Sequence, residues 1–206
     1  MRVGRAMRVA ALGAAAVFLM VLGAALRPLL ITETATPAPV LDAVELGFVQ
    51  DMTAHHQQAL ILTERLDPAA DPAVRKMADQ IAAVQRVEIG TLLGWTQLAG
   101  AAPTSAQPMT WMATSPGHHH DSTTAMPGMA TPADLDALSA ARGADAETLF
   151  LQLMYRHHSG GITMARAADA LLTSGPVKQA ARAMAQAQSQ ELGYLGMLLD
   201  ARGVRP

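Results

Sequence analysis

A repeated motif constrains the fold of this chain more than any other feature. The first copy runs from Phe48 to His56 and the second from Phe150 to His158, 102 residues later; both carry Phe, Gln, Met and twin His at the same spacing. On a helix, the Phe, the Met and the first His of each copy share one stripe, because residues three or four apart share a face. Each copy predicts a helix that buries a thioether and an imidazole, with the second imidazole about 100° round the axis.

A second repeat follows each copy of the first. Gln85-x-x-Glu88 lies in the segment after the first twin histidines, and Gln188-x-x-Glu191 follows the second at a nearly equal distance. The chain is therefore predicted to contain two related helical hairpins, at 42–100 and 144–203. Neither hairpin can bury its apolar face alone, so the two together predict an all-α, antiparallel four-helix bundle.

Local signals set the expected boundaries of these elements. Asp42 is expected to begin the first helix, Asp67-Pro68 to stop it, and Asp71-Pro72 to cap the second helix. Gly160-Gly161 predicts a soft spot inside the third long helix. The expected regions are a linker at 32–41, the bundle at 42–203, a loop at 101–130 rich in Met and His, and a short helix at 131–143.

The N-terminal segment has the pattern of an export signal. Residues 1–8 carry three Arg, and no charged residue occurs between Val9 and Leu26. Because no clean cleavage site follows directly, residues 1–31 are interpreted as a signal peptide or, preferably, an uncleaved anchor helix that spans the membrane through residues 9–26. The bundle is then expected outside the cytoplasm, membrane-anchored or, after cleavage, secreted or periplasmic.

Composition excludes several classes of protein. Cysteine is absent, which removes disulfides, iron–sulfur clusters and thiolate zinc sites. The net charge is −2 and the chain has no basic patch, so nucleic-acid binding is not expected. The chain contains 13 methionines, which is unusually many for its length.

Thioether and imidazole ligands without thiolates favour copper among the common metals. Met prefers Cu(I), and His binds both Cu(I) and Cu(II). Two facing helices that each carry the repeated motif are expected to bring four His and at least two Met together. The loop at 101–130 carries further candidates, although it could equally be a plain linker: Met109, Met112, His118, His119, His120, Met126 and Met129.

Two other interpretations of the same residues remain open. In the first, Glu88 and Glu191 accept hydrogen bonds from His55 and His157, and the polar layers fix the helix register without any metal. In the second, the bundle is a ferritin-like di-metal oxidase, which is less favoured because such centres use several carboxylates with Glu-x-x-His pairs and this chain has no such pair. A non-enzymatic protein is therefore expected.

The motifs together resemble a known family, the domain of unknown function 305. The resemblance rests on the two Met-x-x-His-His motifs, the Met-Pro-Gly-Met-Ala-Thr-Pro segment at 126–132 and the Gln-x-x-Glu repeats, and it covers about residues 42–203. It implies a ferritin-like bundle and, because some members are implicated in periplasmic copper binding, copper sequestration or transfer.

Carried over by position, the resemblance gives a set of metal-ligand candidates. These are Met52, His55, His56, Met154, His157, His158 and Met164. Asp51, Glu88 and Glu191 are the carboxylates expected to orient the ligating histidines. The partners considered are the metal ion, a second copy of the chain and a copper-handling protein.

Overall fold

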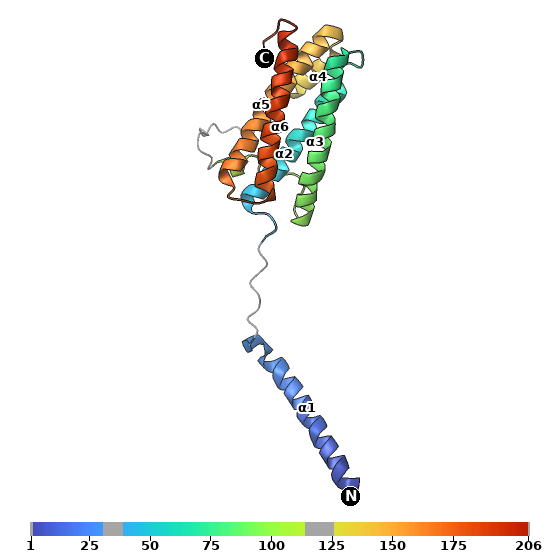
Figure 1. Ribbon diagram of the computed structural model, residues 1–206, viewed down its shortest axis with the longest axis vertical. Helices are drawn as coiled ribbons and strands as arrows, with labels where there is room; N and C mark the ends of the chain where they lie inside the picture. The colour runs from blue at the N-terminus through green and yellow to red at the C-terminus, as the bar shows by residue number, and fades with distance from the viewer. Residues whose placement is uncertain (1, 31–38, 114–125, 206) are drawn as a thin grey trace. The chain divides into compact units, whose positions relative to one another are not determined.

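Helices form all the regular structure in the part of the chain that the computed structural model describes, residues 2–30, 39–113 and 126–205 (Figure 1). The all-α prediction is confirmed. The elements are α1 (Arg2–Leu30), α2 (Ala43–Arg65), α3 (Pro72–Leu98), the short 3-10 helix η1 (Thr110–Met112), α4 (Pro132–Ala140), α5 (Gly143–Leu171) and α6 (Pro176–Asp200).

The chain divides into two compact units, Met1–Pro39 and Val40–Pro206. Helix α1 is the regular element of the first unit and includes the apolar run Val9–Leu26. None of the helices within the described ranges combines the length and the apolar character needed to cross a membrane. The membrane anchor at residues 9–26 stays a prediction.

Side-chain caps explain where the helices of the second unit begin. The Asp42 carboxylate accepts from the backbone N–H of Glu45, and the Glu45 side chain accepts from the N–H of Asp42, which is a capping box at the start of α2. Asp71 caps α3 by accepting from the N–H of Ala73. Thr131 and Asp134 form a second capping box at the start of α4.

The second unit is built from two hairpins, α2–α3 and α5–α6, which meet through α2 and α5 (Figure 1). Helix α4 lies between the hairpins in sequence and packs against α5 and α2. The predicted four-helix bundle, made from two copies of a helical hairpin, is therefore present.

The buried apolar side chains fall into two clusters. On α2, Phe48 and Met52 belong to one cluster, whereas Ala59 and Leu62 belong to the other. On the antiparallel helix α5 the order is reversed, so that Phe150 and Met154 pack with Ala59 and Leu62, and Met164 packs with Met52. The twin histidines of each helix lie between the two clusters. A polar layer therefore crosses the middle of the bundle.

Helix α5 continues without interruption through Gly160 and Gly161, the pair at which the sequence predicts a soft spot. Both glycines are buried, and each gives a neighbour the room that a side chain would take. A Cβ on Gly160 would lie 2.0 Å from the Pro127 carbonyl oxygen, and one on Gly161 would lie 2.3 Å from Oε1 of Gln188. Close packing, and not flexibility, explains this pair.

Candidate metal centre

The four histidines of the repeated motif meet at the contact between α2 and α5. All four side chains are fully buried. The rings of His55 and His157 lie almost on top of one another, with their centroids 3.9 Å apart and their planes at 37°. The ring centroids of His55 and His56 are 6.4 Å apart, and those of His157 and His158 are 6.2 Å apart. The two copies of the motif therefore come together as the sequence predicts.

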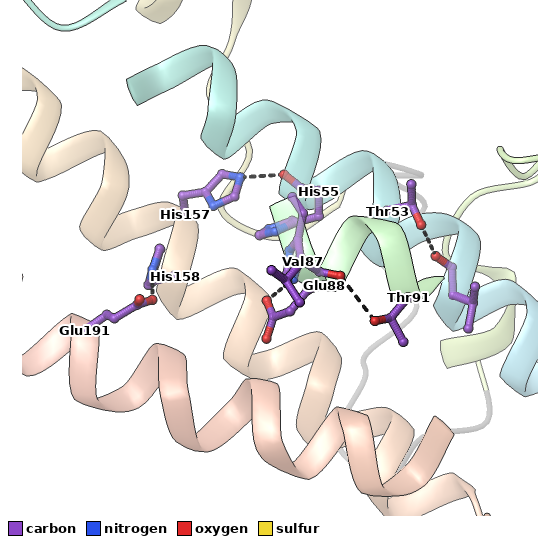
Figure 2. Close-up of polar contacts among 10 residues, drawn as sticks. Thr53, His55, Val87, Glu88, Thr91, His157, His158 and Glu191 are labelled. Atoms are coloured by element: carbon purple, nitrogen blue, oxygen red, sulfur yellow. Dashed lines mark hydrogen bonds and ion pairs between the residues drawn. The ribbon is translucent and has the colours of Figure 1, made fainter. Parts of the chain in front are cut away.

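We call the second histidine of each pair, His56 or His158, the outer histidine, and the first, His55 or His157, the inner histidine. Each outer histidine contacts a carboxylate of its own hairpin. Nε2 of His158 is hydrogen-bonded to Oε2 of Glu191 at 2.7 Å (Figure 2). Nε2 of His56 lies 2.8 Å from Oε2 of Glu88, which is close enough for an ion pair but not aligned as a hydrogen bond. The prediction that these carboxylates bond to His55 and His157 is wrong. The packing of α3 on α2 and of α6 on α5 places each carboxylate beside the second histidine of the pair.

The two inner histidines bond to backbone carbonyls. Nε2 of His157 lies 3.1 Å from the carbonyl oxygen of His55 (Figure 2), and Nε2 of His55 lies 3.1 Å from the carbonyl oxygen of Pro127. A carbonyl oxygen can only accept, so each Nε2 must carry the proton. Burial lowers the pKa of His55 to about 3 and that of His157 well below its usual range. Both rings are therefore neutral near pH 7, and each Nδ1 carries a lone pair.

The unpaired atoms of the core gather in this layer. Among the described residues, every buried side-chain nitrogen or oxygen without a hydrogen-bond partner belongs to the repeated motifs. They include Nδ1 of all four histidines and both amide atoms of Gln85 and Gln188. Gln85 and Gln188 were not among the predicted site residues, and the repetition of Gln-x-x-Glu is the sequence signal that could have indicated them. Their burial, at 1% and 2% exposure, places them in the core.

The predicted methionine ligands are fully buried but separated. Met52 and Met164 lie in the apolar cluster at one side of the histidine layer, and Met154 lies in the cluster at the other side. Met52 and Met154 do not share a cluster, because antiparallel helices place the methionines that precede the two histidine pairs on opposite sides of the layer. The thioethers flank the imidazoles instead.

Asp51 has a different role from the predicted one. Its Oδ2 accepts hydrogen bonds from the backbone N–H of Met109, at 2.7 Å, and from Nε1–H of Trp111, at 2.9 Å. Burial raises the pKa of this carboxyl, and the two hydrogen bonds partly oppose that shift. Asp51 thus holds the segment around η1 on α2, and its hydrogen bonds do not go to a histidine.

Three of the loop methionines gather at one apolar cluster. Met112 is buried beside Met52, and Met109 and Met126 pack at the edge of the same apolar cluster. Met129 is partly buried next to Ala130. His118, His119 and His120 lie outside the described residues.

The donors of the layer suit a soft metal better than a hard one. In the described parts of the chain, no three His, Cys, Asp or Glu side chains are grouped so that they could hold an ion. The layer instead offers the Nδ1 atoms of four imidazoles. Three of the rings are hydrogen-bonded through Nε2 to a carbonyl or carboxylate, and Nε2 of His56 lies 2.8 Å from the Glu88 carboxylate. Such contacts are how proteins orient metal-ligating histidines. Thioethers lie on both sides. Imidazole with thioether fits copper, whereas zinc sites usually have four ligands of nitrogen, oxygen or thiolate.

A family model and several solved structures match this chain. The model described as a domain of unknown function, DUF305, matches residues 45–199. The chain belongs to the DUF305 family. None of the curated proteins matches it.

Two of the similar structures come from named organisms. A DUF305 protein of Streptomyces coelicolor, described as a candidate secreted protein, is 36% identical with a TM-score of 0.70, over 79% of this chain and 94% of that one. A DUF305 fragment from Deinococcus radiodurans is 28% identical with a TM-score of 0.64, over 78% and 97%.

A third protein of the same fold, CopM, has been solved with copper. Its Cu(II)-bound form is 23% identical to this chain with a TM-score of 0.60, and its Cu(I)-bound form is 23% identical with a TM-score of 0.58. Each covers 76% of this chain and 96% of CopM. At this identity the likeness establishes a shared fold.

Proposed function

We propose that this DUF305 protein is an exported, non-enzymatic copper-binding protein that buffers copper or passes it to a partner protein. Four buried imidazoles carry the proposal: each Nδ1 has no hydrogen-bond partner, and each Nε2 lies within 3.1 Å of a carbonyl or carboxylate oxygen. Copper chemistry is supported by the buried thioethers on both sides of the layer and by the copper-bound forms of CopM. Export is supported by the basic and apolar N-terminal pattern and by the Streptomyces coelicolor relative.

The residues proposed to hold the metal are the four histidines together with Met52, Met154 and Met164. Glu88 and Glu191 support this role by contacting Nε2 of His56 and His158, which leaves the Nδ1 atoms for the metal. Bound copper would supply a soft, redox-active cation at this layer. A non-enzymatic role is supported by the two carboxylates of the layer already contacting imidazoles, since a di-metal oxidase needs several carboxylates as ligands.

The experiment is an anaerobic Cu(I) titration of the full chain against a competing chelator. We expect tight binding that is lost when His55, His56, His157 and His158 are replaced by Ala and the variant remains helical by circular dichroism. A variant with His118, His119 and His120 replaced by Ala is the matched control and should bind like the wild type. Binding that survives in the folded bundle variant would move the metal to the loop.

A second pair of variants avoids large cavities. Met52→Leu and Met154→Leu nearly conserve side-chain volume, so each should cost less than about 1.5 kcal/mol of stability. Loss of a thioether ligand should weaken Cu(I) binding and leave Cu(II) binding nearly unchanged. Equal affinities in wild type and both variants would remove Met52 and Met154 from the proposed ligand set.

The His–Glu contacts favour a second candidate function. Contacts of Glu88 with His56 and of Glu191 with His158 are expected of a purely structural layer that fixes the register of the helices. That role predicts no copper binding by the wild type, and the four-alanine variant should then lose stability alone.

A further inference from the structure

The segment Met126–Ala130, which we call the strap, lies against α2 and α5 beside the histidine layer. Its end is fixed to α2 by two hydrogen bonds: Nε2–H of Gln58 donates to the Ala130 carbonyl at 2.9 Å, and the Ala130 N–H donates to Oε1 of Gln58 at 2.6 Å. One side-chain amide thus pairs with both polar groups of one residue. Such a pairing fixes the orientation of the strap as well as its position.

The middle of the strap contacts both a predicted ligand and α5. The Pro127 carbonyl accepts from Nε2–H of His55 at 3.1 Å. The same carbonyl lies so close to α5 that any Cβ at Gly160 would be 2.0 Å away. Gly128 has φ of 76°, and a Cβ there would lie 2.4 Å from the Arg156 carbonyl oxygen. Only glycine at 128 and 160 lets the strap approach at this distance.

The strap marks the place where the two copies of the repeat differ. Gln58 and Gly160 are separated by the same 102 residues as Phe48 and Phe150, so they occupy equivalent positions. In the first copy the Gln58 side chain at this position holds the strap. In the second copy the lack of a side chain at Gly160 leaves room for the strap. The inner histidines differ accordingly, because His157 bonds to α2 and His55 bonds to the strap.

We propose that the strap is a positioning element for the metal centre, with Gln58 and Gly160 as positioning residues that act through the Pro127 carbonyl. By accepting the Nε2 proton of His55, Pro127 fixes the tautomer that offers Nδ1 to the metal and holds the ring against rotation. The strap thereby sets the affinity of the site and the rate at which it releases metal. This role rests on the proposed copper function.

The first test needs no metal. Long-range ¹H–¹⁵N NMR on the metal-free full chain reports which ring nitrogen of His55 carries the proton. We expect the Nε2–H form in the wild type, and a mixture of tautomers in Gln58→Ala and Gly160→Ala, because both changes withdraw the Pro127 carbonyl. Gln50→Ala, which removes a hydrogen bond from α2 to the Ala102 carbonyl, and Gly193→Ala, which adds a Cβ in open space, are the controls.

The second test measures copper. Removing the group that orients a ligating histidine costs ~10–100-fold in metal affinity, so the two strap variants should bind Cu(I) that much more weakly and release it faster than the two controls. A wild type that binds no copper overturns the proposed function. Unchanged His55 tautomer and unchanged affinity in both strap variants overturn the role of the strap.

Discussion

Glu88 and Glu191 reach the buried histidines from the edge of the bundle, where their side chains remain 19% and 17% exposed. Replacing Glu191 by Leu would leave Nε2–H of His158 buried without an acceptor. Such an orphaned donor costs ~1–3 kcal/mol, so we expect the free energy of unfolding in urea to fall by that amount. Glu191→Gln keeps an acceptor oxygen and should recover most of it.

The control for this prediction is Glu64→Leu on the exposed side of α2. It makes the same Glu→Leu substitution at an exposed position that contacts no histidine, and it should alter the free energy of unfolding by less than about 0.5 kcal/mol. Equal effects of the two leucine substitutions would mean that the contact between Glu191 and His158 contributes no stability.

The inner histidines make stability depend on pH. The pKa of His55 is about 3 in the folded chain and near 6.5 when the ring is free, and burial shifts His157 in the same direction. Between these values the unfolded chain binds protons that the folded chain does not, so stability falls as pH falls from about 6.5 towards 3. Urea midpoints of the metal-free protein at pH 7.5 and pH 5 should show this loss, and a His55→Gln/His157→Gln variant should lose less.

At the scale of elements, local chemistry explains what the sequence could predict. Asp42, Asp71 and Thr131 are caps that act within three residues, so the starts of α2, α3 and α4 follow from the residues nearby. The pairing of Glu88 with His56, and not with His55, depends on how α3 is rotated against α2. The position of Met154 depends on the antiparallel packing of α2 and α5. Such relations between helices leave no signal in the spacing along either helix.

The segment around η1 offers a prediction at this scale. In a Trp95→Phe background, Trp111 is the remaining tryptophan, and its ring is 7% exposed with Nε1–H bonded to Asp51. Asp51→Ala removes the acceptor of two hydrogen bonds, so the segment should leave α2, the tryptophan emission should shift to the red, and stability should fall by ~1–3 kcal/mol. Asp79→Ala, an exposed change on α3, should do neither.

For the whole molecule, the polar layer separates two apolar clusters that could otherwise join into one core. Replacing a buried ion pair by apolar residues of similar volume is often neutral or stabilising by about 1–4 kcal/mol, whereas removing one partner is destabilising. Stability therefore does not by itself require the layer, and its repetition in both hairpins is consistent with the proposed metal-binding role.

A combined variant separates these roles. His56→Leu, Glu88→Leu, His158→Leu and Glu191→Leu together remove both His–Glu pairs and leave apolar contacts in their place. We expect the folded, helical variant to unfold at the same or higher urea concentration than the wild type and to bind copper at least tenfold more weakly. Glu88→Leu alone should instead be less stable than the wild type, because Nε2 of His56 then stays buried without the Glu88 carboxylate beside it. Failure of the combined variant to fold would make the layer a determinant of the helix register, while unaltered copper binding would remove His56 and His158 from the proposed ligand set.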